Sequence, residues 1–411
     1  MIRYGKAGGE MEILYLTGAA VSPNSLSNLP FITNRIEALK SLGVNTHNVS
    51  LIEVFSKVLG ALVKMKYPDY HRIPSKDWGD KIVKKGINYF LVPYDIRLSG
   101  FLKKYSNSSI AYEMLKKRVD LSLFDFVRAH WSFPEGVIGM EINKEFNTPY
   151  AITCHGYDIN VLPYRNTKIK NMIVESLENS IFNIFVSKAL LQNAKDLGYS
   201  GRNAYVIPNG FDPQIFRYEE KETARKSLNM SNEKSNYVGY VGNLIPVKGA
   251  DRLPEIFSNI CELKKNVVFV IVGAGVLLEE VKRKLDTFRV IFAGQVSYEE
   301  VATYMQAMDV LVAPSRNEGW GCVIKEAQAC GTPVVGSNVG GIPEAIGDGG
   351  YVVDQGKDFE KRFAEAVVYE LNHRTDKKMI LAAAEGFSWE HIVRKEISLY
   401  ELIGKPRSEL V

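Results

Sequence analysis

The sequence contains little cysteine and no long apolar run. Its four cysteines include no pair with CxxC spacing, so neither a zinc site nor a disulfide framework is expected. This cysteine usage fits a reducing cytosol best. No apolar run approaches the ~18 residues that span a membrane, and the first ten residues lack the apolar core of a signal peptide. We set those ten residues aside as a tail or an upstream start, because Met11 directly precedes the first strand-like run.

Strong charge of either sign is also missing. The net charge is +4, far below that of a dedicated nucleic-acid binder, so no nucleic-acid partner is expected. The length of 411 residues is too great for one ordinary domain and suits two domains. These totals indicate a two-domain globular protein. They do not identify its activity, which has to be inferred from the motifs in the loops.

Apolar β-rich runs alternate with longer helical patterns along most of the chain. Strands are expected at 12–17, 124–131, 150–154, 237–242, 267–273, 290–294, 309–314 and 333–336, and helices at 29–42, 137–146, 250–263, 277–285, 298–307 and 322–330. Strand–helix alternation predicts βαβ units and parallel sheets. The fold class is therefore α/β, with two Rossmann-like domains, 11–207 and 208–385, facing a central cleft. The boundary falls in a turn-rich, charged stretch near 208–216.

The loop SRNEGWG follows the strand at 309–314 and opens a helix. Backbone N–H groups at a helix start lack acceptors and attract anions such as phosphate. Those concerned belong to Gly319, Trp320, Gly321, Cys322 and Val323. Glu318 lies just before them, and Glu326 lies about a turn and a half into the helix, where a carboxylate accepts two hydrogen bonds from a vicinal diol such as ribose. The alternative is a capping and a surface carboxylate, and spacing alone leaves both interpretations open.

Two further loops of the second half carry candidate groups. Lys248 in VGNLIPVKGAD is placed to neutralise a leaving diphosphate, although a solvated lysine in a turn fits as well. Gly242 in that loop allows close backbone approach. Gly273 and Gly275 in VGAGVLLEEV favour a tight turn beside a ligand. The third glycine of a dinucleotide fingerprint is replaced by leucine, so a nicotinamide cofactor is disfavoured.

The first half offers small residues and two histidines at strand ends. The loop TGAAVSPNSLSNLP, which includes Gly18, allows close approach to a ligand, although a plain loop is an equal alternative. TCHGYD brings His155 and Asp158 to the end of one strand, and AHWSFPEG brings His130 to the end of the preceding one. Only six histidines occur in the chain, and two at adjacent strand ends favour a functional role over a purely structural one.

Taken together, these motifs resemble the retaining, nucleotide-sugar-dependent glycosyltransferases of family four, which have the GT-B fold. The matching segments are, in order, AHWSFPEG, TCHGYD, VSKALLQNAKDLG, VIPNGFDPQIF, VGNLIPVKG, VIVGAG, VIFAGQV and PSRNEGWGCVIKEAQACGTPVVGSNVGGIPEAI. The last contains the family's glutamate–seven residues–glutamate signature. FSWEHIVRKEISLY resembles the terminal helix, about 386–404, that completes the first domain. The resemblance covers roughly residues 11–404 and is most specific in the second half.

The resemblance implies a nucleotide-diphosphate sugar as donor substrate, with no cofactor and no catalytic metal. It implies that Glu326 binds the ribose, that Glu318 and the helix-start amides hold the sugar and phosphates, and that Lys248 stabilises the leaving diphosphate. His155 would contact the transferred sugar near its anomeric centre. Two further residues, Ser187 and Asn209, would support the site. The acceptor would attack on the face of the leaving group, a phosphate oxygen would take its proton, and the anomeric configuration would be retained.

One position departs from the family pattern. The family usually has an arginine where this chain has Asn243, and that arginine acts with Lys248 on the diphosphate. Its loss removes a charge-assisted contact worth about 1.5–3 kcal/mol. Arg316 or Arg252 is a candidate substitute, and the sequence leaves open whether activity is preserved, weak or absent.

The acceptor side is less defined. Residues 53–66 place apolar side chains on one helical stripe, and the first domain carries Lys57, Lys64, Lys76, Lys81, Lys84, Lys85, Lys103, Lys104, Lys116, Lys117 and Arg118. Such a face docks on an anionic membrane that holds a lipid-linked acceptor, or it is a helix packed on its own core with a solvated basic side. We expect peripheral contact with the cytoplasmic face of a membrane, although the helix itself fits core packing better.

The resemblance predicts a transferase that moves a hexose or N-acetylhexosamine to a glycan, lipid-linked or protein acceptor, in cell-envelope or capsule assembly. Two alternatives stay open. The chain is a non-catalytic partner subunit, which Asn243 supports and the intact Lys248, Glu318 and Glu326 oppose. Otherwise it is a nucleotide-sugar epimerase of the same fold, which would use donor without acceptor.

Overall fold

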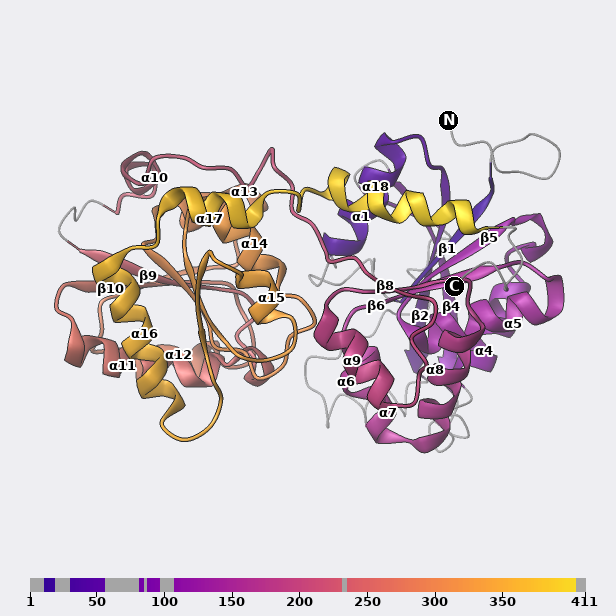
Figure 1. Ribbon diagram of the computed structural model, residues 1–411, viewed down its shortest axis with the longest axis horizontal. Helices are drawn as coiled ribbons and strands as arrows, with labels where there is room; N and C mark the ends of the chain where they lie inside the picture. The colour runs from indigo at the N-terminus through magenta and orange to yellow at the C-terminus, as the bar shows by residue number, and fades with distance from the viewer. Residues whose placement is uncertain are drawn as a thin grey trace. The chain divides into compact units, whose positions relative to one another are not determined.

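The computed structural model describes residues 11–18, 30–55, 81–84, 87–96, 107–230 and 235–403. These residues form two compact units (Figure 1). The C-terminal unit is the continuous segment Asn209–Ser388. The N-terminal unit contains the described residues up to Pro208 together with those from Trp389 onward, so the end of the chain returns to the first unit.

A largely parallel sheet forms the centre of the N-terminal unit. Its strands in the described ranges follow the order β3-β4-β2-β1-β5-β6-β7-β8. They are β1 (Ile13–Gly18), β2 (Thr46–Phe55), β3 (Lys81–Lys84), β4 (Ile87–Ile96), β5 (Phe126–His130), β6 (Tyr150–Cys154), β7 (Asn183–Phe185) and β8 (Ala204–Val206). Neighbouring strands pair in parallel except β3, which pairs antiparallel with β4. Strands β5 and β6 are buried along their whole length, which explains their continuous apolar sequence.

Helices connect these strands. They are α1 (Pro30–Ser41), α4 (Asn107–Lys116), α5 (Val137–Phe146), α6 (Tyr157–Asn160), α7 (Leu162–Arg165), α8 (Thr167–Asn179) and α9 (Lys188–Asp196). The last helix of the chain, α18 (Trp389–Ser398), packs on α1 and thereby completes this unit (Figure 1).

The C-terminal unit is a second parallel sheet with helices. Its strands are β9 (Asn236–Val241), β10 (Val267–Val272), β11 (Val290–Gly294), β12 (Val310–Ala313), β13 (Val334–Ser337) and β14 (Gly350–Val353), in the order β11-β10-β9-β12-β13-β14. Its helices are α10 (Lys221–Ser227), α11 (Leu253–Leu263), α12 (Leu278–Lys284), α13 (Tyr298–Ala307), α14 (Cys322–Ala329), α15 (Ile342–Ile346), α16 (Phe359–His373) and α17 (Lys377–Ala384). The core is apolar and closely packed: Phe257 of α11 stacks on Phe269 of β10 with ring centroids 3.8 Å apart.

Both sheets reverse their strand order at one point. Counted along the chain, the C-terminal sheet runs 3-2-1-4-5-6, and the reversal lies between β9 and β12. In the N-terminal sheet it lies between β1 and β5. Connections leave the two strands at such a point toward opposite faces of the sheet, and open α/β sheets bind ligands at the carboxyl ends there. The loops after these four strands are therefore the places to look for a site.

The sequence-based expectation for residues 53–66 is wrong at its start. Residues 53–55 end strand β2, where Glu53 is opposite Tyr94 and Phe55 is opposite Ile96 of β4. The apolar spacing that predicted a helix is shared by the end of a strand, and pairing with β4 decides in favour of the strand. Residues 56–66 lie outside the described ranges.

A buried ionic cluster ties α18 to the rest of the N-terminal unit. Glu396 of α18 accepts hydrogen bonds from Arg35 of α1 at 3.0 Å and from Arg128 of β5 at 2.9 Å. All three side chains are fully buried. Tyr400 adds a hydroxyl donor at 3.1 Å, and Arg128 also donates to the Thr153 hydroxyl. Removal of any one of these three charged groups should lower the stability of the unit, because a charge would remain buried without a partner.

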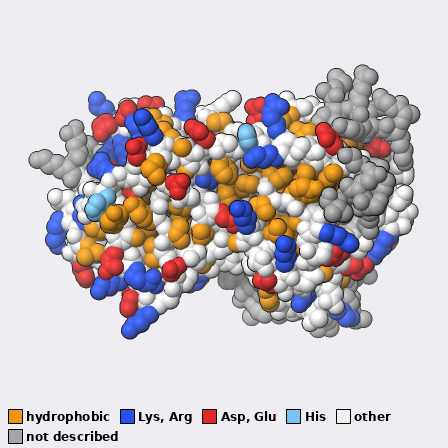
Figure 2. Space-filling view, in the orientation of Figure 1, with side chains coloured by type: hydrophobic (Ala, Val, Ile, Leu, Met, Phe, Trp, Pro, Cys, Tyr) orange, Lys and Arg blue, Asp and Glu red, His pale blue; other side chains and the backbone are white. Residues whose placement is uncertain are grey.

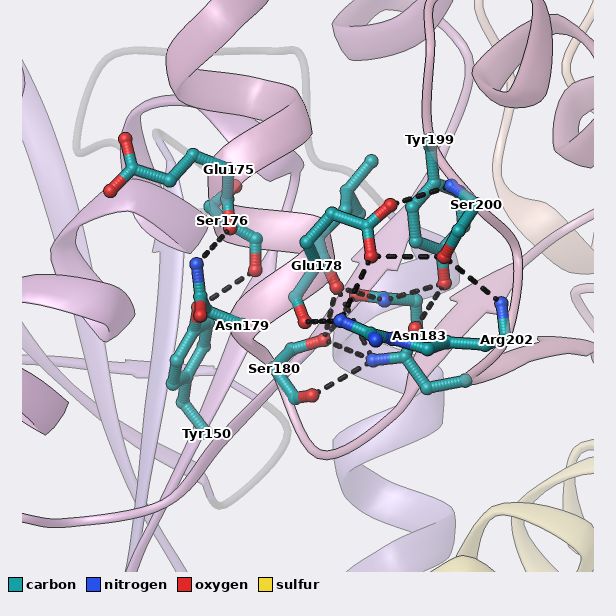
Figure 3. A network of polar contacts seen from close by, with 12 residues as sticks. Tyr150, Glu175, Ser176, Glu178, Asn179, Ser180, Asn183, Tyr199, Ser200 and Arg202 are labelled. Carbon is teal, nitrogen blue, oxygen red and sulfur yellow. Dashed lines mark hydrogen bonds and ion pairs between the residues drawn. The ribbon is translucent and has the colours of Figure 1, made fainter. Parts of the chain in front are cut away.

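A second polar network holds the far edge of the same sheet (Figure 3). The buried Asn183 of β7 donates to the Tyr199 hydroxyl at 2.9 Å. Nearby, the Glu178 carboxylate accepts from the backbone N–H and the hydroxyl of Ser200 and pairs with Arg202 at 3.3 Å. These bonds connect the end of α8 with β7 and with the segment that leads into β8. They satisfy polar groups of the scaffold and lie away from the switch-point loops.

Candidate active site

The loops after β9 and β12 meet at the switch point of the C-terminal sheet. The backbone N–H of Arg316 donates to the Val247 carbonyl at 2.9 Å, which joins the two loops directly. Gly249 has φ +71°, and a Cβ there would lie 2.0 Å from the Pro314 carbonyl oxygen. Glycine is therefore required at position 249 both for its backbone conformation and for the close approach of the second loop.

The loops bring two predicted catalytic residues into contact. The Lys248 ammonium nitrogen lies 2.5 Å from Oε2 of Glu318. The two side chains are only partly exposed, 33% for the lysine and 16% for the glutamate. We call this the Lys248–Glu318 pair. Seventy positions of sequence separate the two residues, so spacing alone does not reveal the contact.

Helix α14 begins directly after Glu318 and the glycines. Gly321, with φ +86°, is its N-cap and has no side chain that could satisfy the first amides. In the part of the chain that the structure describes, the N–H groups of Gly319 to Val323 donate to no backbone carbonyl. The Glu318 carbonyl accepts from the Gly341 N–H at 3.1 Å, which anchors the loop. The helix start therefore has the unsatisfied donors and the positive dipole end that favour an anion.

Trp320 of this loop is buried, whereas Cys322, the first residue of α14, is partly exposed. Trp320 stacks on Phe387, with ring centroids 5.7 Å apart. This packing fixes the position of the loop backbone at residue 320. The Cys322 thiol has a pKa raised by burial and by the nearby Glu326 and Glu318 carboxylates, and it contacts the Asn209 side chain. Asn209 is itself buried. The predicted supporting residue Asn209 thus touches the first residue of α14.

Glu326 is a buried carboxylate one turn into α14. Glu326 is only 8% exposed, and this burial raises the pKa of its carboxyl group from 4.5 to about 7. The Tyr298 hydroxyl, on α13, donates to Oε1 at 3.4 Å, a long contact that lowers this pKa only in part. A buried carboxylate with spare acceptor capacity is suited to a diol. Tyr298 was not predicted as a site residue, because it stands near the start of a helix with no motif around it.

The glycines after β9 and β10 pack against each other. A Cβ on Gly273 would lie 2.0 Å from the Gly242 carbonyl oxygen, and one on Gly275 would lie 2.4 Å from the Leu244 carbonyl oxygen. Backbone hydrogen bonds join the same segments, with Leu244 donating to Ala274 at 2.9 Å. These glycines have a structural requirement of their own, whatever they contribute to a ligand.

Asn243 is exposed, and its backbone carbonyl accepts from the Tyr240 hydroxyl at 2.8 Å. Both arginines considered as substitutes for the usual family arginine are engaged elsewhere. Arg316 forms a two-pronged ion pair with Asp251 at 2.7 and 2.8 Å. Arg252 donates to the Pro314 carbonyl at 3.0 Å and to Gln355 at 2.9 Å. Because both arginines are engaged by other groups, Lys248 is the basic side chain of these loops that contacts Glu318.

In the N-terminal unit, the two strand-end histidines contact each other. His130 Nδ1 lies 2.8 Å from His155 Nε2, and the rings are stacked. Burial lowers the pKa of both imidazoles well below the usual value, and the nearby Arg128 and Arg35 lower it further. Both rings are therefore neutral at neutral pH, so one nitrogen of the contact donates and the other accepts.

The contact is compatible with either of two tautomers. Nε2 of His130 and Nδ1 of His155 are both buried and have no hydrogen-bond partner among the described residues. Whichever ring donates across the contact, the accepting ring carries its proton on the nitrogen that faces away from it. One of the two outer nitrogens is therefore an N–H without a protein partner, and the other is a bare nitrogen.

The other predicted residues of this unit organise the loops. Asp158 is buried, and its carboxylate accepts from the N–H groups of Ser132, His155 and Gly156 at 2.9 to 3.1 Å, while burial raises its pKa. Ser187 accepts from the Leu190 N–H at 3.1 Å and so caps α9. A Cβ on Gly18 would lie 2.5 Å from a Glu135 carboxylate oxygen, so glycine makes room for that buried side chain. The rest of the loop after β1, residues 19–29, lies outside the described ranges.

A cavity of about 510 Å³ lies elsewhere in the N-terminal unit. Its lining comes from the amino ends of β1 and β2 and from the segment before β5, and includes Glu12, His47 and Phe124. His47 and Glu12 form an exposed pair at 2.6 Å at its edge. Because open α/β sheets bind their ligands at the carboxyl ends of strands, this cavity is not the expected donor site.

Most of the basic residues expected to face a membrane lie outside the residues that the structure describes. Lys57, Lys64, Lys76, Lys85, Lys103 and Lys104 lie outside the described residues, and the side chains of Lys81 and Lys84 are not described. Lys116 is described and pairs with Glu145 at 2.8 Å. Figure 2 shows basic and acidic side chains interspersed over the visible face of the C-terminal unit. None of the helices in the described ranges is long and apolar enough to cross a membrane.

Comparison with known proteins relates both halves of the chain to glycosyltransferases. A family model described as "Glycosyl transferases group 1" matches residues 220–385, and one described as "Glycosyltransferase Family 4" matches residues 43–215. An uncharacterized glycosyltransferase of Methanocaldococcus jannaschii is 29% identical over 310 residues, which cover 73% of this chain and 82% of that protein. N-acetyl-alpha-D-glucosaminyl L-malate synthase of Bacillus anthracis is 26% identical over 287 residues, covering 68% of this chain and 74% of that protein.

Solved structures show the same fold at low sequence identity. Sucrose-phosphate synthase of Thermosynechococcus elongatus superposes with a TM-score of 0.72 at 20% identity, covering 95% of this chain and 98% of that one. Anabaena HepE in complex with UDP gives a TM-score of 0.69 at 18% identity, covering 95% and 100%. The two sheets and the likeness to these structures show that the chain has the GT-B fold. With both halves matched by glycosyltransferase models, the chain belongs to the group 1 and family 4 glycosyltransferases.

Proposed function

We propose that this glycosyltransferase moves a hexose or N-acetylhexosamine from a nucleotide-diphosphate sugar to an acceptor with retention of the anomeric configuration. The observation that carries the proposal is the meeting of Lys248, Glu318 and the start of α14 at the switch point of the C-terminal sheet. A cation, unsatisfied amides and carboxylates within one loop pair match a ligand that has both phosphates and hydroxyl groups.

Each group has a proposed task in donor binding. The N–H groups at the start of α14 and the Lys248 ammonium hold the diphosphate and stabilise the negative charge that it gains as it leaves. Glu326, one turn further on, accepts from the ribose diol. Glu318 accepts from hydroxyls of the sugar. His155, whose Nδ1 has no hydrogen-bond partner among the described residues, contacts the transferred sugar.

The proposed chemistry relies on positioning. The acceptor hydroxyl attacks the anomeric carbon on the face from which the diphosphate leaves, and a phosphate oxygen takes the acceptor proton. Holding donor and acceptor in reacting geometry lowers the barrier without a protein nucleophile. Lys248 and the helix amides supply the charge stabilisation that a metal ion supplies in other transferases, so we propose that the reaction proceeds without metal.

The acceptor is proposed from the relatives. A Bacillus subtilis protein named as a teichuronic acid biosynthesis glycosyltransferase, TuaC, is 28% identical over 341 residues, covering 82% of this chain and 83% of that protein. This likeness supports a glycan or lipid-linked acceptor in cell-envelope or capsule assembly, with peripheral contact to the cytoplasmic face of a membrane. A small-molecule acceptor, as the malate synthase name suggests for that relative, is the competing choice.

The test is a thermal-shift and calorimetric panel of UDP-, GDP-, ADP- and dTDP-sugars against the purified chain in EDTA. We expect one nucleotide to stabilise the protein, because a ligand that binds only the folded state raises the unfolding temperature. Lys248→Ala is compared with Lys282→Ala, a matched lysine in the exposed Lys282–Glu279 pair of the same unit. Absence of stabilisation by every donor would favour the non-catalytic partner subunit, and conversion of donor without acceptor would favour the epimerase.

A further inference from the structure

The Lys248–Glu318 pair joins two residues that the proposed function assigns to different halves of one ligand. The ammonium is assigned to the diphosphate, and the carboxylate is assigned to the sugar hydroxyls. In the structure the two groups hold each other at 2.5 Å. An ammonium only donates hydrogen bonds and an ionised carboxylate only accepts them, so each offsets the charge of the other. A diphosphate that binds Lys248 therefore competes with Glu318 for the ammonium.

The two ligands of a glycosyltransferase site differ in how they replace this contact. A nucleotide sugar offers an anion to Lys248 and hydroxyl donors to Glu318, so both residues exchange one partner for another. A nucleoside diphosphate offers only the anion. It leaves the Glu318 carboxylate without a donor and next to a phosphate of the same sign, which is unfavourable at a site where both side chains are mostly shielded.

The backbone around the pair confines the change to side chains. The Glu318 carbonyl is anchored by Gly341, and a Cβ on Gly340 would lie 1.8 Å from that oxygen. On the other loop, the Lys248 N–H donates to the Ile245 carbonyl at 3.1 Å, and Gly249 packs on Pro314. Both backbones are fixed, whereas both side chains reach partly into solvent. Opening the pair therefore needs rotamer changes and no movement of the sheet.

The arginines of these loops are bound to other groups, so among their basic residues only Lys248 is paired with a predicted donor-site residue. Arg316 is held by Asp251, and Arg252 is held by Pro314 and Gln355. Asn243, which stands where the family usually has an arginine, brings no charge. Whatever engages Lys248 therefore decides how strongly the loops attract a diphosphate.

We propose that the Lys248–Glu318 pair is a latch that makes the site select the nucleotide sugar over the nucleoside diphosphate left after transfer. The inference rests on the proposed function and deepens it, because it assigns Glu318 a second task as competitor for Lys248. Bound donor satisfies both groups, and loss of the sugar lets Glu318 return to Lys248 and expel the diphosphate.

The test is calorimetric binding of UDP and UDP-glucose, with GDP and GDP-mannose as the second set, to the full chain and to Glu318→Gln. The amide keeps the size of the side chain and removes its charge. The matched control is Glu279→Gln, which removes the same charge from the exposed pair with Lys282 in the same unit. Thermal unfolding of the three proteins establishes that each is folded.

We expect Glu318→Gln to bind the nucleoside diphosphate about two- to fivefold tighter, since a partly exposed ion pair no longer competes. We expect it to bind the nucleotide sugar about tenfold more weakly, since a charge-assisted acceptor is lost. Weaker sugar binding with unchanged diphosphate binding would overturn the latch and leave Glu318 as a plain sugar contact. A parent protein that binds none of the four probes and none of the ADP- and dTDP-sugars of the donor panel would overturn the proposed function, and the latch with it.

Discussion

Glu326 allows the most quantitative prediction, because its carboxyl group has a large and attributable pKa shift. Burial raises the pKa from 4.5 to about 7. A shift of one unit corresponds to about 1.4 kcal/mol, so keeping this carboxylate ionised in the folded protein costs about 3 kcal/mol. Replacing it by glutamine removes that cost and keeps the size of the side chain.

The sign follows from proton binding. Between pH 4.5 and pH 7 the folded state holds a proton on Glu326 that the unfolded state has released. The parent protein therefore loses stability as pH rises through this window, and the loss is complete above pH 7. Glu326→Gln avoids the loss, so its advantage over the parent should be full at pH 8 and small at pH 5, where only the first part of the loss has occurred.

Differential scanning calorimetry at pH 5 and pH 8 measures the effect. For a unit of this size, about 2–4 °C accompanies each kcal/mol, so the expected gain at pH 8 is about 6–12 °C in the transition of the C-terminal unit. That transition is recognised by its response to nucleotide. Binding should change in the opposite direction, with nucleotide affinity about tenfold or more lower, because the ribose diol loses a charged acceptor.

The control is Glu279→Gln, an exposed glutamate of the same unit, which should show neither change. A Glu326→Gln protein that is less stable than the parent at pH 8, or whose advantage is the same at both pH values, would refute the account of a carboxylate strained by burial. Unchanged nucleotide affinity would remove Glu326 from the donor site.

Three further changes test other parts of the structure. Lys248→Ala should mainly lower turnover, by about tenfold or more, since charge stabilisation of the leaving group is lost; steady-state kinetics with the donor found in the panel measures it. His130→Asn, which keeps a polar group near the position of Nδ1, should retain more turnover than His130→Leu, and equal turnover of the two variants would argue against a role for the His130–His155 contact. Glu396→Gln should destabilise the N-terminal unit by about 3–5 kcal/mol in urea unfolding, because two buried arginines lose their partner, whereas Glu390→Gln on the exposed face of α18 should change it little.

The sequence predicted five of the six strands of the C-terminal unit, because they are continuous apolar runs bounded by glycine or proline, but it did not predict β14 or the helices α10, α15, α16 and α17. Helix α13 at 298–307 and strand β11 at 290–294 have the expected bounds. In the N-terminal unit, the three-residue strands β7 and β8 were not predicted, since so short a run has no readable periodicity. The end of β2 was assigned to a helix because three residues fit either period, and only pairing with a neighbouring strand separates the two.

The candidate residues were found from the sequence, but their contacts were not. Lys248 and Glu318 were assigned to different parts of a ligand, and only the fold shows that they hold each other. Likewise, the histidine pair depends on two strands that become neighbours in the sheet. Gly273 and Gly275 were read as ligand-side glycines, whereas their closest approach is to the backbone of the loop after β9. Sequence motifs report residue types at loop ends, and they carry no information on which loops touch.

The position of Glu396 also bears on how the protein is made. Ribosomes deliver the chain from its amino end, and domains usually fold as they emerge. Here the first unit receives the carboxylate partner of Arg35 and Arg128 only with helix α18, after the whole second unit has been synthesised. The half that is translated first is therefore the half that is completed last, and a chain that ends between residues 388 and 396 has the whole second unit but lacks the carboxylate of the first.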